Sequence, residues 1–307
     1  MTDEQSIKAI EVPDFAVSTI QELVKKIFDD AGIYFRIFSR AKSQQSITEK
    51  LIRKNYPKQG KKMRDLIGVR VVFYFREDLD IAQVLIEKKL QCIESTIDPI
   101  KTDVFRPERM NFVCRIPKEI PFSVNEVVGD LPIDNTFEIQ VRTVFSEGWH
   151  EIEHDFRYKE ADVWKGMDSF SRTLNGVMAS LETCEWTLSS LFSEIINQKL
   201  AEGDWKSAFK FALRIHLTDS NISDDLKVLI DTDKDFQKEF ICYNRSVFIQ
   251  FLTDTSLGQV PKRLENIIFI INALFVHNSQ VSQAAPELLQ DTINKSIMTF
   301  SQVNGHE

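Results

Sequence analysis

The segment Thr136–Thr143, with the sequence TFEIQVRT, restricts the fold more than any other because apolar and polar residues alternate along it. The apolar set is Phe137, Ile139 and Val141, and the polar set is Glu138, Gln140 and Arg142. Successive side chains of a strand point to opposite faces. The pattern therefore predicts a strand with one face on the core and a second face that carries a carboxylate, an amide and a guanidinium. Such a face can hold a metal-bound phosphate, or it can simply meet solvent in an antiparallel sheet.

The composition indicates a globular protein with room for one large or two ordinary domains. Of the 307 residues, 43% are hydrophobic and 27% are charged, and such values are typical of soluble proteins. The N-terminal residues lack the apolar run of a secretory signal, and the apolar run 267–276 is too short to cross a bilayer. The four cysteines are scattered without a CxxC pair, which favours reduced thiols. We expect a cytoplasmic protein that binds no membrane.

Positive charge is concentrated in residues 36–64, which contain ten Lys/Arg and one acidic residue. This segment therefore carries +9 and leaves −17 on the rest of a chain whose net charge is −8. A basic segment within an acidic protein indicates a local site for a polyanion, although a solvated basic helix would have the same composition.

Helical and strand patterns interleave in the first half of the chain. Helices are predicted at 14–31, from Ser46 (as a capping box with Glu49) to about 54, at 79–89 and at 144–158, and strands at 68–75, 90–97, 110–116 and 136–143. Interleaved strands and helices predict an α+β domain with a mixed sheet. From about residue 160 long helical patterns replace them, such as 167–200 and 261–278, so we expect domains at 1–160 and 161–307. Trp164, Trp186 and Trp205 are expected in the core of the second domain, whose role is structural support, oligomerisation, sensing or self-inhibition.

Two further segments carry residues suited to phosphate and metal chemistry. Asp65 precedes a predicted strand, and Gly68 allows a ligand to approach the backbone closely, so the carboxylate can bind a divalent cation. The pattern D-x-x-G-x-R is also that of an ordinary turn into a strand. Residues 39–50, SRAKSQQSITEK, place cations just before a predicted helix N-terminus, which suits a triphosphate. No GxxxxGK[ST] sequence occurs, so a P-loop is excluded.

The segment His150–His154 matches the zinc protease pattern HExxH on a predicted helix. Two histidines four residues apart can bind zinc, with Glu151 as the base. However, the next histidine along the chain is His216, and five-residue motifs arise by chance. Without further context zinc remains an alternative.

Three segments together resemble one known family. SRAKSQQSITEKLIRK, MRDLIGVRVVFYF and FEIQVRT…WHEIEHDFRYK occur in this order, within residues 36–160, and resemble the synthetase domain of the RelA/SpoT family of alarmone synthetases. The resemblance implies a nucleotidyltransferase-like fold and a Mg²⁺-dependent transfer of pyrophosphate from ATP to the 3′-hydroxyl of GDP or GTP. The family usually has a small residue at the position of His150, so the HExxH match is interpreted as a coincidence.

The resemblance also implies roles for individual residues. Asp65 matches the magnesium-binding aspartate, and Glu138 matches the glutamate that works with the metal and helps to deprotonate the acceptor hydroxyl. The positions that hold ATP correspond to Arg40, Lys42, Ser46, Lys50 and Arg70. Positions near the acceptor or in supporting roles correspond to Phe105, Arg109, Asn111, Gln140, Arg142 and His154.

One departure from the family concerns the acceptor. The family carries G-Y-[RK]-S-x-H before the central strand, and its tyrosine stacks on guanine, whereas this chain has VFRPERMNF at 104–112. Pro107 cannot provide an aromatic platform, and Phe105 is the candidate replacement. The tRNA 3′ end and adenosine nucleotides are therefore alternative acceptors, and a nucleotide-binding module without activity is a further alternative. Partners are expected to be nucleotides, with tRNA or a second copy of the chain as further candidates.

Overall fold

The computed structural model describes residues 10–54, 56, 60–98 and 109–304. The chain forms two compact units, Met1–Lys26 with Phe35–Glu185, and Ile27–Tyr34 with Trp186–Glu307. The boundary between the two units at residues 185 and 186 lies within a long helix. It does not coincide with the domain boundary at residue 160 that is expected from the sequence. That domain division stays a prediction.

The first unit is built on a five-stranded mixed sheet in the order β1-β2-β5-β4-β3. The strands are β1 (Phe35–Ala41), β2 (Ile67–Phe73), β3 (Cys92–Ile97), β4 (Met110–Arg115) and β5 (Thr136–Thr143). β2 runs parallel to β5, and the other neighbours are antiparallel. The helices that begin in this unit are α1 (Asp14–Ala31), α2 (Gln44–Lys54), α4 (Asp78–Lys89), α5 (Val124–Val128), α6 (Val144–Ile152), the π-helix η1 (Glu153–Tyr158) and α7 (Asp168–Ala201), and the last residues of α1 and of α7 belong to the second unit. The mixed sheet with helices confirms the expected fold class.

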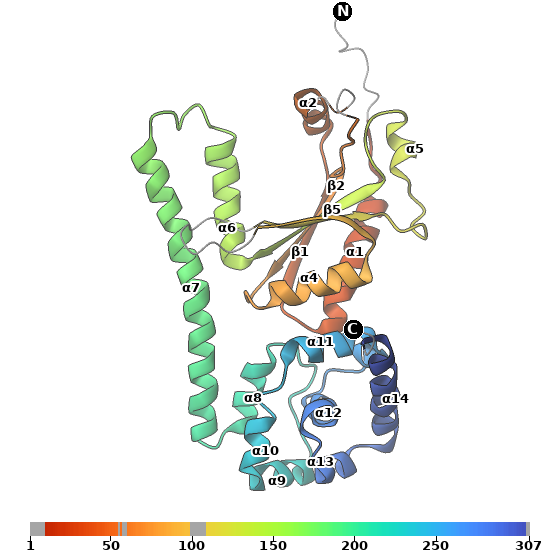
Figure 1. Ribbon diagram of the computed structural model, residues 1–307, viewed down its shortest axis with the longest axis vertical. Coiled ribbons are helices and arrows are strands. Elements are labelled where there is room, and N and C mark those ends of the chain that lie inside the picture. The colour runs from red at the N-terminus through yellow and green to blue at the C-terminus, as the bar shows by residue number, and fades with distance from the viewer. Residues whose placement is uncertain (1–9, 55, 57–59, 99–108, 305–307) are drawn as a thin grey trace, which may run out of the picture. The chain divides into compact units, whose positions relative to one another are not determined.

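The two faces of the sheet differ in chemistry. The apolar residues of β5 and their neighbours Val69, Val71, Phe112 and Cys114 are buried. α4 contacts β5, and α4 and the first part of α1 lie on the same side of the sheet in Figure 1. The opposite face carries the polar residues, and the register aligns them in rows across the sheet. One row runs Phe38, Arg70, Gln140, Asn111 and Thr96, and the next runs Arg40, Gly68, Glu138, Val113 and Glu94.

Two details of the first unit differ from the sequence predictions. β1 was not expected, because it lies within the basic segment and its burial is only partial. α2 begins at Gln44 rather than Ser46, and the side chain of Ser43 accepts the backbone N–H of Ser46 at 3.3 Å. The predicted capping box at Ser46 is therefore wrong, and the capping hydroxyl lies three residues earlier.

The second unit is helical, as expected. It contains α8 (Trp205–Leu213), α9 (Asp224–Thr232), α10 (Lys234–Glu239), α11 (Arg245–Asp254), η2 (Ser256–Gln259), α12 (Leu264–Ile271), η3 (Asn272–Val276), α13 (Ser279–Ala284) and α14 (Glu287–Asn304). Its core is rich in phenylalanine, with Phe209, Phe240, Phe248 and Phe251 fully buried. Trp205 lies in this core, whereas Trp186 is 55% exposed, so its predicted burial is wrong. Within the described ranges, no helix combines the length and the apolar character needed to span a membrane.

Candidate active site

Glu138 lies on the polar face of β5, and two neutral amides hold its carboxylate. The side-chain nitrogen of Asn111 donates to Oε1 at 3.3 Å, and that of Gln140 donates to Oε2 at 3.0 Å. Asn111 lies directly opposite Gln140 in the register of β4 and β5. Each carboxylate oxygen retains a lone pair, because it accepts only one hydrogen bond from these amides. The carboxylate is therefore oriented while it can still accept a proton or bind a metal.

The sheet leaves open space beside Glu138. Gly68 lies opposite Glu138 on one side and opposite Arg40 on the other. A Cβ atom added at Gly68 would have no heavy atom within 4 Å. A side chain at this position would point to the same face as Glu138, since paired residues share a face. The glycine therefore keeps a gap between a carboxylate and a guanidinium.

Asp65 lies just before β2 and is bound by two lysines. Its Oδ2 is 2.6 Å from Lys50 Nζ and 3.1 Å from Lys42 Nζ. The backbone N–H of Lys42 donates to the Leu66 carbonyl at 2.8 Å, which continues the β1–β2 ladder to this point. Burial alone would raise the pKa of Asp65, but the hydrogen bond from Lys50 and the charges of Lys42 and Lys50 outweigh it and lower the pKa below its ordinary value. Asp65 is therefore ionised at neutral pH.

The chemistry of Asp65 fits a magnesium ion. Its Oδ1 is buried and has no hydrogen-bond partner among the described residues. An ionised oxygen without a donor suits a hard cation. In the same part of the chain no group of three or more His, Cys, Asp or Glu is placed to hold a metal. Magnesium needs no such group, because it is ordinarily bound by one or two carboxylates together with substrate phosphates and water. That Asp65 and Glu138 meet on one ion stays a prediction.

Arg70 on β2 is held by two glutamates of α6. Its Nη1 donates to Glu147 at 2.6 Å and also to Glu151, and its Nε donates to Gln140 at 3.3 Å. Burial alone would lower the pKa of Arg70, but the two glutamates outweigh it and raise the pKa above its ordinary value. Glu147 was not among the site residues predicted from the sequence. Its signal was the spacing of Glu147 and Glu151, four residues apart on a helix that directly follows β5.

Arg142 is a buried cation that continues the polar network. Its side chain is only 7% exposed, and its Nη1 donates to Asn111 Oδ1 at 3.2 Å and to the Val141 carbonyl at 2.8 Å. Burial lowers the pKa of Arg142 to about 10, so the group remains charged at neutral pH. Asn111 thereby links Arg142 to Glu138.

The other predicted site residues lie at varying distances from this network. Arg40 is exposed on β1 in the row of Glu138, and Ser46 is exposed on α2. Arg109 pairs with Asp98, its Nε 2.9 Å from Oδ2. His154 is exposed, its Nδ1 is 2.9 Å from Asp155 Oδ1, and its ring stacks on Tyr158. Phe105 lies outside the described residues.

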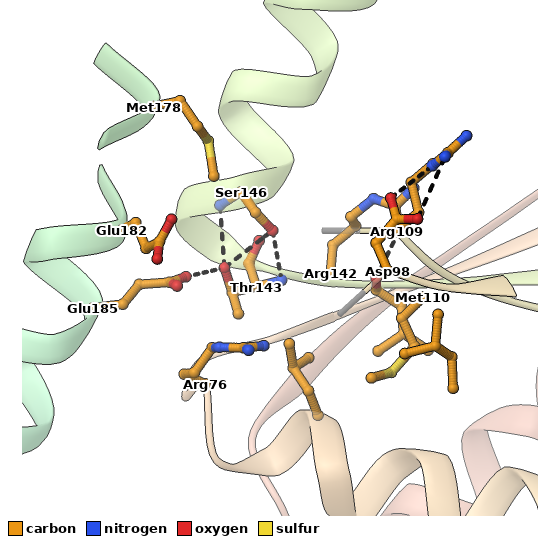
Figure 2. Close-up of a pocket in the computed structure, with 13 residues that line it drawn as sticks. Arg76, Asp98, Arg109, Met110, Arg142, Thr143, Ser146, Met178, Glu182 and Glu185 are labelled. Atoms are coloured by element: carbon orange, nitrogen blue, oxygen red, sulfur yellow. Dashed lines mark hydrogen bonds and ion pairs between the residues drawn. The ribbon is translucent and has the colours of Figure 1, made fainter. Parts of the chain in front are cut away.

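A pocket lined by both charged and apolar side chains adjoins the network at the C-terminal end of β5 (Figure 2). Three guanidinium groups and three carboxylates line it, namely Arg76, Arg109, Arg142, Asp98, Glu182 and Glu185. Thr143 caps α6 by accepting the backbone N–H of Ser146 at 3.1 Å, and its hydroxyl donates to Glu185 on α7. Figure 2 shows that this contact and the Asp98–Arg109 pair lie at different parts of the pocket.

The helix that carries the HExxH pattern changes form between its two histidines. His150 belongs to α6, and the helix becomes π-helical from Glu153 onward. His154 interacts with Asp155 and Tyr158. The structure adds no ligand to the HExxH pattern among the described residues.

Comparisons with known proteins identify the segment that contains the network. Residues 39–163 match a family model described as "Region found in RelA / SpoT proteins". A curated relative, GTP pyrophosphokinase YwaC of Bacillus subtilis (strain 168), is 30% identical over 127 residues. The match covers 39% of this chain and 57% of that relative, so the chain spans little more than half of the relative's length.

Solved structures show a weaker likeness. Small alarmone synthetase 1 from Bacillus subtilis has a TM-score of 0.46 and 20% identity, over 59% of this chain and 93% of that one. A GTP pyrophosphokinase family protein from Streptococcus pneumoniae has a TM-score of 0.42 and 19% identity, over 59% and 88%. The family model covers Asp65, Glu138 and the residues that bind them, so the part of the chain that carries the polar network is the part that is similar to the RelA/SpoT region.

Proposed function

We propose that this protein transfers pyrophosphate from ATP to the 3′-hydroxyl of GDP or GTP in a magnesium-dependent reaction. The observation that carries this proposal is the carboxylate of Glu138, which two amides orient beside the open space at Gly68. The match of residues 39–163 to the RelA/SpoT region and the 30% identity to a GTP pyrophosphokinase support it.

Glu138 is assigned the role of the base. The acceptor 3′-hydroxyl would lie in the gap beside Glu138 and give its proton to the carboxylate as its oxygen attacks the β-phosphorus of ATP. A bond forms between the 3′-oxygen and this phosphorus, the bond to the α-phosphate oxygen breaks, and AMP leaves. In-line placement of the two oxygens is the main requirement of such a transfer, so the amides of Asn111 and Gln140 serve it by fixing the carboxylate.

The cations near Asp65 are assigned to the phosphates of ATP. Lys42 and Lys50 bind the same oxygen of Asp65, and Arg40 is exposed beside Gly68. Arg40 is in the same row of the sheet as Glu138, Lys42 directly follows β1, and Lys50 on α2 is brought to this end of the sheet by its contact with Asp65. A magnesium ion bound by Asp65 and Glu138 would neutralise charge on the transferred phosphates. The buried Oδ1 of Asp65, which no donor occupies among the described residues, is the oxygen that would bind it.

A transfer assay with four acceptors tests the proposal. The full chain is incubated with γ-labelled ATP, magnesium and GDP, GTP, ADP or tRNA in parallel, beside Glu138→Gln and the exposed control Glu119→Gln. Label is expected on GDP or GTP with the wild type and the control, and on no acceptor with Glu138→Gln. Label on ADP or tRNA alone would replace the assigned acceptor by one of the alternatives. Absence of transfer to all four by folded protein would contradict the enzymatic proposal.

A further inference from the structure

Cys92 on β3 and Cys114 on β4 face each other across two antiparallel strands. They are direct partners in the register, and their sulfur atoms are 2.9 Å apart. Both are free cysteines. Neither belongs to the polar face that carries Glu138, because Cys114 is buried on the apolar side of the sheet. The proposed transfer reaction therefore makes no use of them.

The backbone around the two cysteines has the geometry that permits a disulfide. The N–H of Arg115 donates to the Gln91 carbonyl at 2.9 Å, so the flanking residues exchange a hydrogen bond across the strands. Hydrogen-bonded and non-hydrogen-bonded pairs alternate along an antiparallel ladder. Cys92 with Cys114 is next to the hydrogen-bonded residues Gln91 and Arg115, on the regular side of the register shift between Cys92 and Glu94, and is therefore a non-hydrogen-bonded pair. Such pairs have Cα atoms about 4.5 Å apart, within the span of about 4.4 to 6.8 Å that disulfides bridge.

The two thiols differ in accessibility and in acidity. Cys92 is half-buried, whereas Cys114 has no exposed surface. The hydrogen bond from Cys114 lowers the pKa of Cys92 below its ordinary value, and the same interaction together with burial raises the pKa of Cys114. Cys92 is thus the thiol that can reach a reagent as a thiolate, and Cys114 is positioned behind it to react second.

We propose that Cys92 and Cys114 form a redox-active dithiol that closes to an intrachain disulfide on reaction with a low-molecular-weight disulfide such as oxidised glutathione. The thiolate of Cys92 attacks one glutathione sulfur, forms a mixed disulfide and displaces one glutathione. Cys114 then loses its proton, attacks the sulfur of Cys92 and displaces the second glutathione. Two electrons and two protons pass from the protein to one oxidised glutathione, which becomes two molecules of glutathione.

Closure of this disulfide would fix an edge strand of the sheet. β3 is the last strand in the order β1-β2-β5-β4-β3, and among the described residues it pairs with β4 alone, so the bond would join this edge strand to β4. β4 also carries Asn111, which donates to Glu138. Oxidation would therefore act on the strand that orients the candidate base.

The experiment uses the full chain with Cys184→Ser and Cys242→Ser, which remove the two exposed thiols. The protein is treated with oxidised glutathione and its intact mass is measured before and after reduction. The expected product is two hydrogens lighter than the reduced protein, carries no glutathione, and yields a cross-linked peptide that joins Cys92 and Cys114. Its melting temperature is expected to rise by about 5 to 10 °C, because the bond closes a loop of some twenty residues.

Single variants distinguish the two steps. Cys114→Ser is expected to retain one glutathione on Cys92, because the resolving thiol is gone, and Cys92→Ser is expected to remain unmodified, because Cys114 is buried. Protein that keeps both thiols, or that carries glutathione stably on Cys92 with Cys114 present, would overturn the proposal. This measurement on the protein with both cysteines decides the matter even if a single variant fails to fold.

Discussion

Asn111 on β4 donates a 3.3 Å hydrogen bond to Glu138 on β5, and it accepts a 3.2 Å hydrogen bond from the buried Arg142. The neutral amide of Asn111 therefore lies between the carboxylate of Glu138 and the guanidinium of Arg142 and hydrogen-bonds to both. The two contacts also fix the orientation of the amide, because the nitrogen must donate to Glu138 and the oxygen must accept from Arg142. Asn111 is thus a positioning residue for the candidate base.

Replacement of Asn111 by alanine is expected to lower both stability and transfer. Arg142 would lose a partner while it is buried, which costs about 1 to 3 kcal/mol of unfolding free energy. Glu138 would lose one of its two orienting donors, and the transfer rate should fall about tenfold to a hundredfold. Urea unfolding and the transfer assay measure the two effects. Thr96→Ala, on the exposed residue directly opposite Asn111, is the control, and an equal loss in that variant would contradict the assignment.

Gly68 offers a test of the open space beside Glu138. Gly68→Ala and Gly68→Leu are expected to fold, because a Cβ added at this position meets no atom within 4 Å. Glycine is unfavourable within a strand, so the alanine variant should be unchanged in stability or more stable by about 0.5 to 1 kcal/mol. Gly68→Leu should fill the gap and lower transfer at least about tenfold, as a misplacement of about 1 Å costs a hundredfold. Binding of ATP by calorimetry and the transfer assay provide the readouts. The control is Gly176→Leu, at an equally open position on α7, which should transfer pyrophosphate at the wild-type rate. A wild-type rate in Gly68→Leu would show that no substrate enters the gap beside Glu138.

The elements whose side chains show a clear period were predictable from the sequence. β5 was placed at its exact limits because apolar and polar residues alternate along Thr136–Thr143, and α1 because its apolar stripe ends at Gly32. β1 was missed because Phe38 lies 55% exposed on the polar face, which breaks the alternation. An edge strand needs only one paired neighbour, so partial burial is sufficient for it.

The sequence was sufficient to predict which residues belong to the candidate site, but not which of them contact one another. The alternation along β5 placed Glu138 and Gln140 on one face, whereas the register that sets Gly68 and Asn111 beside them depends on pairing between strands distant in the chain. A shift of one residue would have reversed every side chain. The pairing of Arg70 with Glu147 and Glu151 depends in the same way on the direction in which α6 extends from the end of β5. No local sequence pattern specifies this direction.

The lysines around Asp65 predict how stability depends on pH. Burial alone would raise the pKa of Asp65, but Lys50 and Lys42 lower it below the ordinary value, which is near 3.9. The unfolded chain therefore binds this proton more readily than the folded protein does, and stability rises with pH through this range. The contribution is fully present above about pH 4 and is lost as pH falls through the lowered pKa.

Asp65→Asn removes this contribution and is expected to flatten the acid side of the stability profile. The difference in unfolding free energy between wild type and variant should be largest near neutral pH and shrink as pH falls below about 4. Urea unfolding at a series of pH values measures it. Asp162→Asn is the control, because that side chain is 90% exposed and its loss should leave the profile unchanged. A constant difference between wild type and Asp65→Asn at every pH would contradict the role of the lysines.

Glu147 and Glu151 both bind Nη1 of Arg70, and they are expected to contribute unequally to stability. The side chain of Glu147 is 18% exposed and that of Glu151 is 54% exposed. Solvent screens the exposed pair, so Glu151→Gln should cost less than about 1 kcal/mol. Glu147→Gln replaces a charge-assisted hydrogen bond in a shielded position and should cost about 1 to 2 kcal/mol.

The double variant separates these two contributions from each other. With both glutamates replaced, Arg70 keeps Gln140 as a neutral partner at 3.3 Å, and its half-buried charge loses both of the carboxylates that bind it. The double variant should therefore lose more unfolding free energy than the sum of the single variants, because each glutamate compensates for the loss of the other. Urea unfolding of the wild type, the two single variants and the double variant gives the coupling free energy. Equal single effects with no coupling would show that solvent, rather than α6, stabilises the charge of Arg70.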